Sequence, residues 1–470
     1  MLRPEFEDHA DRAELQELIE QFESYFQSQS YGYLDEDALE RLYEFYESRM
    51  EVAKLEAVAE LAISQNPFSG EFLTRKAELL FNRGAMDDAL ALLEKALVFD
   101  SSNVDVHILK SDILLELNQS KQAAEVLLSA LETADDQDKD VILAELSDIY
   151  ELKEDFEKAF DCLEQAIRYN PQNDAVLMKL AHIVEMTDKY DESLKLHNQI
   201  VDEHPYNWMA WYNLGKAYSG SGQYQKALDS YEFTIAIQED FDLVYRDAAD
   251  IYFRLELYDK AISSFNEAQS KSGGFEDHNF RIGLCHEKLQ DYKKARFHYR
   301  KATRQDPYMD EAFFRIAETY KLEGRYEPAI VNYKKALRID HENEFYITCL
   351  IGLYRMTGRE EEVGQHLQQL VTLRPEINNY WLDYITYSYE CEAFNDALDL
   401  VEIALERCGK FAEFIYLQSL LNWKLGKTRE ALNLLANALE DDYIQHRIIH
   451  EIDPDFFTVQ SHQELLEMYR

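Results

Sequence analysis

The sequence contains few of the residues that break or cross-link a chain. Among its 470 residues there are 8 prolines, 15 glycines and 5 cysteines. The cysteines are scattered without any CxxC pair, which predicts buried free thiols and no disulfide framework. Runs of β-branched residues are absent, whereas Ala, Leu, Glu, Lys and Tyr dominate. The composition therefore predicts an all-helical chain.

Long apolar stretches are missing as well. No segment is apolar for long enough to span a membrane. The first residues, MLRPEFEDHADRAELQEL, are acidic early and lack the apolar core of a signal peptide. We therefore expect no membrane insertion and a cytoplasmic location.

Positive charge is scarce. The chain has 48 lysines and arginines against 91 aspartates and glutamates, which gives a formal net charge of −43. A surface of this sign repels phosphate backbones, so it disfavours nucleic acid as a partner.

The sequence patterns of catalysis are also missing. No phosphate-cradling Gly-rich loop, nucleophile elbow or zinc-protease motif occurs. Asp136, Asp138 and Asp140 have calcium-loop spacing, but the next residue is not the glycine that this loop requires. His446 and His450 lie one helical turn apart without a third ligand. We therefore expect no enzyme, no metal and no cofactor.

The sequence does contain a repeat of 34 residues. The clearest copy is WMAWYNLGKAYSGSGQYQKALDSYEFTIAIQED from Trp208, and its skeleton returns as FFRIAETYKLEGRYEPAIVNYKKALRID from Phe313. A small residue opens the second half of most copies: Ala89, Ala123, Ala159, Ser193, Ala227, Ala261, Ala295, Ala329, Ala397 and Ala431. This register gives about twelve copies, starting near residues 36, 70, 104, 140, 174, 208, 242, 276, 310, 344, 378 and 412. A fixed period of this length predicts a helical solenoid.

The skeleton resembles the tetratricopeptide repeat. In the best copy the matching residues are Trp211, Leu214, Gly215, Tyr218, Ala227 and Tyr231. The resemblance implies an all-α, right-handed α-solenoid (superhelix) of about twelve helix pairs with terminal capping helices. We expect an N-terminal capping helix over residues 1–35, a continuous repeat array over 36–445 and a C-terminal cap over 446–470. The layout, with the run HPYNWMAWYNLGKAY, also resembles cytoplasmic repeat proteins of Bacteroidetes-type bacteria, which implies no particular activity.

The resemblance also suggests where a ligand would bind. In the family, the first helix of each repeat lines the concave face through fixed positions. Those positions and their neighbours give a candidate peptide-binding groove: Tyr212, Lys216, Arg246, Phe280, Arg281, Phe314 and Arg315. Aromatics mixed with cations suit an extended peptide that carries a carboxylate or phosphate. The alternative is that some of these residues merely pack between helices.

Charge is distributed unevenly along the chain. Residues 251–350 hold 17 basic and 16 acidic residues, whereas the first 200 hold 18 and 45. The matching groove positions of the first repeats are acidic, so that end should prefer basic ligands. The clearly basic stretch is DYKKARFHYRKATRQ, residues 291–305. It is either a solvated convex face or a docking patch for an acidic segment, from a partner or from another copy's acidic first half, so self-association is possible.

These observations favour a non-enzymatic scaffold or adaptor that binds partner proteins or peptides in its groove. One alternative is an accessory subunit held permanently in an enzyme or envelope-assembly complex. The other is an RNA-binding solenoid, which the charge disfavours.

Overall fold

The chain folds entirely into helices in the part that the structure covers. The computed structural model describes residues 5–28, 32–272 and 278–470. Within these ranges every regular element is a helix and none is a strand, which confirms the all-α prediction. None of the helices described there is long and apolar enough to cross a membrane. The chain divides into two compact units, unit 1 (Met1–Ile251) and unit 2 (Tyr252–Arg470).

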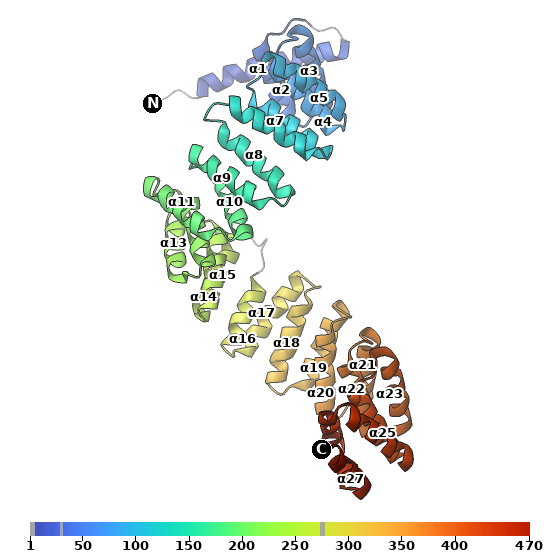
Figure 1. Ribbon diagram of the computed structural model, residues 1–470. Coiled ribbons are helices and arrows are strands. Elements are labelled where there is room, and N and C mark those ends of the chain that lie inside the picture. Colours follow the sequence, from blue (N-terminus) through green and yellow to red (C-terminus); the bar gives the residue numbers. More distant parts are fainter. Residues whose placement is uncertain (1–4, 29–31, 273–277) are drawn as a thin grey trace. The chain divides into compact units, whose positions relative to one another are not determined.

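Unit 1 starts with a single long helix, α1 (Glu5–Ser28), and continues as pairs of shorter helices (Figure 1). The pairs are α2 (Glu36–Ser48) and α3 (Val52–Gln65), α4 (Gly70–Asn82) and α5 (Met86–Phe99), α6 (Val104–Glu116) and α7 (Ser120–Thr133), α8 (Lys139–Leu152) and α9 (Phe156–Tyr169), α10 (Asp174–Thr187) and α11 (Tyr190–Glu203), and α12 (Trp208–Gly220) and α13 (Tyr224–Ile237). The next helix, α14 (Asp242–Arg254), contains the boundary between the units.

Unit 2 repeats the same arrangement. Its elements are α15 (Tyr258–Lys271), α16 (Asn279–Lys288), α17 (Tyr292–Gln305), α18 (Asp310–Leu322), α19 (Tyr326–Ile339), α20 (Glu344–Thr357), α21 (Glu360–Leu373), α22 (Asn378–Glu390), α23 (Phe394–Cys408), α24 (Ala412–Lys424), α25 (Thr428–Asp441), η1 (Tyr443–His446), α26 (Arg447–Ile452), η2 (Pro454–Thr458) and α27 (Gln460–Met468). In the described part of the chain, first and second helices thus alternate twelve times from α2 to α25. The predicted number of repeats is confirmed.

Small residues set the contact between the two helices of a pair. All ten residues that phase the sequence, from Ala89 to Ala431, are buried. In the pair α12 and α13, Ala227 faces Gly215, where an added Cβ would lie 3.2 Å from the Ala227 carbonyl oxygen. A larger side chain at either position would push the helices apart, because the side chains at the contact set the distance between two packed helices.

A left-handed residue ends the first helix of every pair. Positive φ angles recur at Met50, Gly84, Asn118, Glu154, Asp188, Gly222, Glu256, Gln290, Gly324, Gly358, Glu392 and Gly426. The spacing is 34 residues except between Asn118 and Glu154, where it is 36. The two extra residues belong to the run TADDQDKD. This conformation turns the chain tightly from one helix to the next.

Both ends of the chain pack on the neighbouring pair. Ile19 and Phe22 of α1 are buried in one apolar cluster with Leu39 and Leu42 of α2. At the other end, buried Asp453 accepts a hydrogen bond from the Tyr389 hydroxyl at 2.6 Å. Its carboxylate also lies 2.5 Å from the ammonium group of Lys424. The extents expected for the two caps and for a continuous array stay predictions.

All five cysteines are free thiols. Cys162 and Cys285 are buried, as expected. Cys391 is exposed, so the prediction of a buried thiol is wrong there. The reason is local, because Cys391 directly follows α22 at the turn, where its side chain reaches solvent.

Candidate functional site: the first-helix faces and a loop pocket

The seven residues predicted to form the groove lie on first helices in both units. Unit 1 carries Tyr212 and Lys216 on α12 and Arg246 on α14, and unit 2 carries Phe280 and Arg281 on α16 and Phe314 and Arg315 on α18. One contiguous surface through all seven residues stays a prediction.

In unit 1 the predicted residues bond to their neighbours. Tyr212 is 4% exposed, and its hydroxyl donates a hydrogen bond to Asp247 at 2.7 Å. Burial raises the pKa of Tyr212, and the Asp247 charge adds to the effect, so the hydroxyl keeps its proton. Arg246 Nε donates to the other Asp247 oxygen at 3.1 Å. Lys216 forms an ion pair with Glu185 at 2.7 Å. Tyr212 therefore acts in packing.

The aromatic residues of the unit 2 group also pack between helices. Phe314 is 9% exposed, and its ring centroid lies 5.8 Å from that of Tyr333 and 5.3 Å from that of Tyr346. Phe280 is half-buried, 5.6 Å from the ring of Tyr299. Aromatic pairs at these separations stabilise helix contacts. The side chains of Phe314 and Tyr212 thus fit the alternative that some of the seven residues pack between helices.

The two arginines of this group differ in their surroundings. Arg281 is exposed and forms no ion pair within the described residues. Arg315 lies between two carboxylates, 3.5 Å from Glu287 on α16 and 3.3 Å from Glu311 on its own helix. Glu287 also accepts the Tyr299 hydroxyl at 2.6 Å. Arg315 therefore ties α18 to α16, whereas Arg281 is available to an external anion.

An open part of the first-helix face of unit 2 lies one pair further along, on α20. Phe345 and Met356 are 60% and 61% exposed, and Thr348 between them is also exposed. Gly352 completes this stripe, and a Cβ added there would meet nothing within 4 Å. The sequence analysis missed these residues because its strip ended at α18. The same inward positions carried forward by 34 residues would have included Phe345, Thr348 and Gly352.

The first helices of unit 1 hold a group of carboxylates. Burial raises the pKa of Asp112, and the charge of Asp148 raises it further. Burial also raises the pKa of Glu145. Lys179 lies 2.6 Å from Asp148 and partly neutralises the group. A preference of this end for basic ligands stays a prediction.

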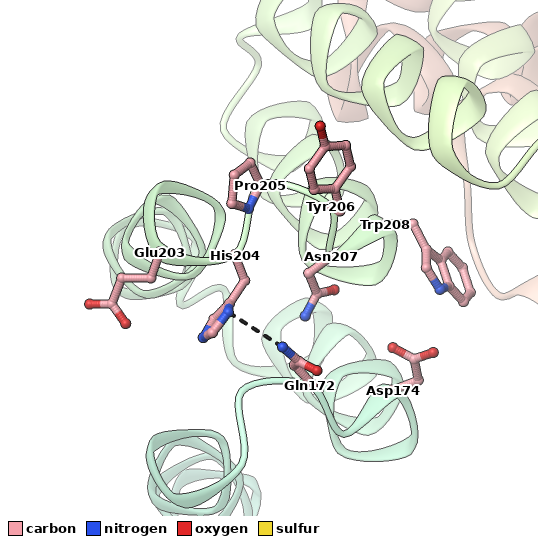
Figure 2. A pocket seen from close by; sticks show the side chains of 8 residues that line it. All are labelled: Gln172, Asp174, Glu203, His204, Pro205, Tyr206, Asn207 and Trp208. Carbon is pink, nitrogen blue, oxygen red and sulfur yellow. Dashed lines mark hydrogen bonds between the residues drawn. The ribbon is translucent and has the colours of Figure 1, made fainter.

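A polar recess at the loops of unit 1 lies between the α9–α10 and α11–α12 connections (Figure 2). It has a volume of about 490 Å³ and is lined by Gln172, Asp174, Glu203, His204, Pro205, Tyr206, Asn207 and Trp208. Gln172 and His204 lie 3.4 Å apart, as the dashed line in Figure 2 marks. Burial raises the pKa of Asp174, although a hydrogen bond with Trp208 opposes the shift. The lining contains no serine, threonine, cysteine or lysine.

Within the described ranges no three His, Cys, Asp or Glu residues lie together in a way that could hold a metal ion. The first-helix faces of unit 2 carry the exposed apolar side chains Phe345 and Met356 and the exposed cation Arg281.

Three solved structures are similar to this chain at low sequence identity. The Cut9–Hcn1 hetero-tetramer of APC/C matches with 14% identity over 96% of this chain and 98% of that chain, with a TM-score of 0.42. YrrB, described as a TPR protein with an unusual peptide-binding site, matches with 22% identity over 40% and 95%, with a TM-score of 0.29. The human IFIT1 dimer with m7Gppp-AAAA matches with 18% identity over 83% and 94%, with a TM-score of 0.36. No curated protein matches the chain.

Family models match the repeats themselves. Five models described as tetratricopeptide repeat cover residues 52–105, 80–144, 142–173, 208–241, 279–308 and 310–343. The matches fall on the helix pairs described above and begin or end close to their boundaries. These segments of the chain are therefore tetratricopeptide repeats.

Proposed function

We propose that the protein is a non-enzymatic scaffold that binds a peptide segment of a partner protein on the first-helix face of unit 2. This face comprises the solvent-exposed sides of α16, α18 and α20. Side-chain contacts join the three helices, since Arg315 of α18 lies 3.5 Å from Glu287 of α16 and the ring of Phe314 on α18 lies 5.4 Å from that of Phe345 on α20.

The observation that carries the proposal is the glycine in the middle of α20. Glycine in a helix interior costs about 1 kcal/mol relative to alanine. Gly352 has helical neighbours on both sides and open space where a Cβ would lie, so nothing inside the protein requires a glycine there. A missing side chain lets another backbone approach the helix closely. Exposed Phe345 and Met356 on either side offer apolar contact to the same ligand.

The cations define the polar end of the site. Arg281 is exposed, and Arg315 sits on the neighbouring first helix, half-satisfied by two glutamates. A carboxylate or phosphate of the peptide near Arg281 would gain a charge-assisted hydrogen bond. We therefore expect a peptide with apolar side chains toward α20 and an anionic group toward α16.

The test is a display library of random peptides of about sixteen residues, selected against the full-length protein. The selected peptides are then titrated against Gly352→Leu, Arg281→Glu and the control Gln368→Leu. Gln368 is exposed on α21, the second helix of the same pair, so its leucine adds the same apolar group on another surface. We expect Gly352→Leu to weaken binding at least tenfold, about 1.4 kcal/mol at 25 °C, without loss of helicity. We expect the control to leave binding unchanged.

Two other outcomes would assign the protein differently. Equal binding by wild type and Gly352→Leu would refute the site on α20. A permanently bound accessory subunit, the first alternative, would show itself by a partner that co-purifies and dissociates over hours. An RNA-binding solenoid, the second, would shift mixed RNA in a salt-dependent way.

A further inference from the structure

The second helices of unit 2 carry an exposed basic face that the groove does not use. Helix α17 has no acidic residue among its fourteen. Three of its exposed residues are Phe297, Lys301 and Arg304, and the residues 34 positions further on α19 are Val331, Lys335 and Arg338, which are also exposed. Both helices pack on α18, so equivalent positions point to the same side of the unit. These six residues are called the α17–α19 face.

The α17–α19 face combines exposed cations with exposed apolar side chains. Phe297 is 55% exposed and Val331 is 52% exposed. Lys301 lies over the ring of Phe297 at 4.8 Å. Within the described residues none of the four cations forms an ion pair with a carboxylate. Some cations elsewhere in the chain do, as Lys189 does with Glu157 and Lys179 with Asp148.

The pattern is not a requirement of the repeat. One repeat earlier the equivalent residues on α15 are Ser263, Glu267 and Ser270, and one repeat later on α21 they are Gln365, Gln369 and Thr372. The fold therefore accepts uncharged and acidic residues at these positions. In a chain with 91 acidic and 48 basic residues, these two neighbouring helices thus carry four exposed cations that the fold does not require.

We propose that the α17–α19 face docks an acidic segment of a partner protein that also carries a large apolar side chain. Carboxylates of the segment would pair with Lys301, Lys335 and the two arginines, and its apolar group would cover Phe297 and Val331. This surface lies on second helices and is separate from the site on α20.

The size of the face favours a short protein segment over other anions. A fourteen-residue helix is about 21 Å long, so a nucleic acid of ordinary length would extend from the face onto acidic surface, where its phosphates are repelled. An extended anionic membrane meets the same obstacle. A second copy of the chain would bring two proteins of charge −43 together, and such a head-to-tail contact need not close on itself.

The test uses the full-length protein and a fluorescein-labelled peptide of about twelve residues, made of glutamate with phenylalanine at every fourth position. The variant is Lys301→Glu with Lys335→Glu. The matched control is Lys121→Glu with Lys195→Glu, which makes the same change of charge at exposed lysines on second helices of unit 1. We expect the first variant to weaken peptide binding at least tenfold, the control to weaken it less than twofold, and Gly352→Leu to leave it unchanged.

Several results would overturn the proposal. One is that the acidic peptide does not bind to the wild type. Another is an equal loss of peptide binding in both double variants, which would show that the effect comes from net charge alone. Tighter binding of single-stranded RNA or of phosphatidylserine vesicles, abolished by Lys301→Glu with Lys335→Glu, would assign the face to those ligands. Self-association of wild type, measured by light scattering and lost in the same variant, would assign it to a second copy. An unchanged unfolding profile and helicity of each variant would show that a loss of binding does not come from misfolding.

Discussion

Three glycines inside first helices allow a sharp test of the packing, because alanine should act in opposite directions. At Gly215 a new Cβ would collide with the ring of Tyr231, and at Gly283 it would lie 2.5 Å from Cε1 of Tyr299. At Gly352 it would meet nothing within 4 Å. The helix preference is the same in all three cases, so the surroundings decide the result.

The magnitudes follow from two opposing effects. Alanine gains about 1 kcal/mol over glycine in a helix interior. Overpacking a tight contact costs about 1–3 kcal/mol, and neither tyrosine can move away easily. Tyr231 is buried with its ring 5.9 Å from that of Tyr212, and the hydroxyl of buried Tyr299 is bonded to Glu287. We expect Gly352→Ala to stabilise its pair by about 1 kcal/mol and the other two to destabilise theirs by about 1 kcal/mol.

The assay is native-state hydrogen exchange on the full-length protein, followed helix by helix. A repeat array does not unfold as one cooperative unit, so a single unfolding midpoint would mix the effects. Exchange should become faster in α12 and α13 for Gly215→Ala, in α16 and α17 for Gly283→Ala, and slower in α20 and α21 for Gly352→Ala. The same sign of change at all three glycines would refute the reasoning.

Two further changes test the interior and the turns. Buried His197 accepts a hydrogen bond from Asn213 at 3.2 Å and donates one to the Ser193 carbonyl at 2.8 Å, and burial lowers its pKa to about 4 from 6.5. The neutral form therefore contributes about 3 kcal/mol to the free energy of unfolding above pH 6.5, and this contribution is lost as the pH falls toward 4. We expect His197→Leu to flatten the pH dependence of the free energy of unfolding in that interval, and an unchanged slope would contradict the assignment. Gln290 has a φ of 60°. Gln290→Gly should relieve the left-handed strain and raise the free energy of unfolding by about 0.5–1 kcal/mol. A decrease in the free energy of unfolding, measured by denaturant titration, would show that the turn is unstrained.

The fold was predictable because one packing rule repeats along the chain. Small residues such as Ala227 and Ala295 must lie where two helices touch, and their spacing fixed every pair from α2 to α25 within a few residues. The left-handed turn residues were only partly predictable. Glycines such as Gly222 mark such turns by composition, whereas Glu154 and Glu392 adopt the same conformation against their preference.

The candidate site was less predictable, because the family pattern gives the sequence positions that face the groove but not the side chains that surround them. Phe314 stands at an inward position, yet Tyr333 and Tyr346 on neighbouring helices are large enough to enclose it. Gly352 looks in the sequence like another packing glycine of the kind seen at Gly215. Only the empty space around its Cβ position distinguishes the two.

The central claim is that a partner peptide binds across the first helices of unit 2. The most direct measurement is hydrogen–deuterium exchange of the full-length protein with and without the tightest peptide from the display library. The account predicts slower exchange in α16, α18 and α20 on binding, with the centre of protection around Gly352. Protection confined to α17 and α19, or to unit 1, would contradict it.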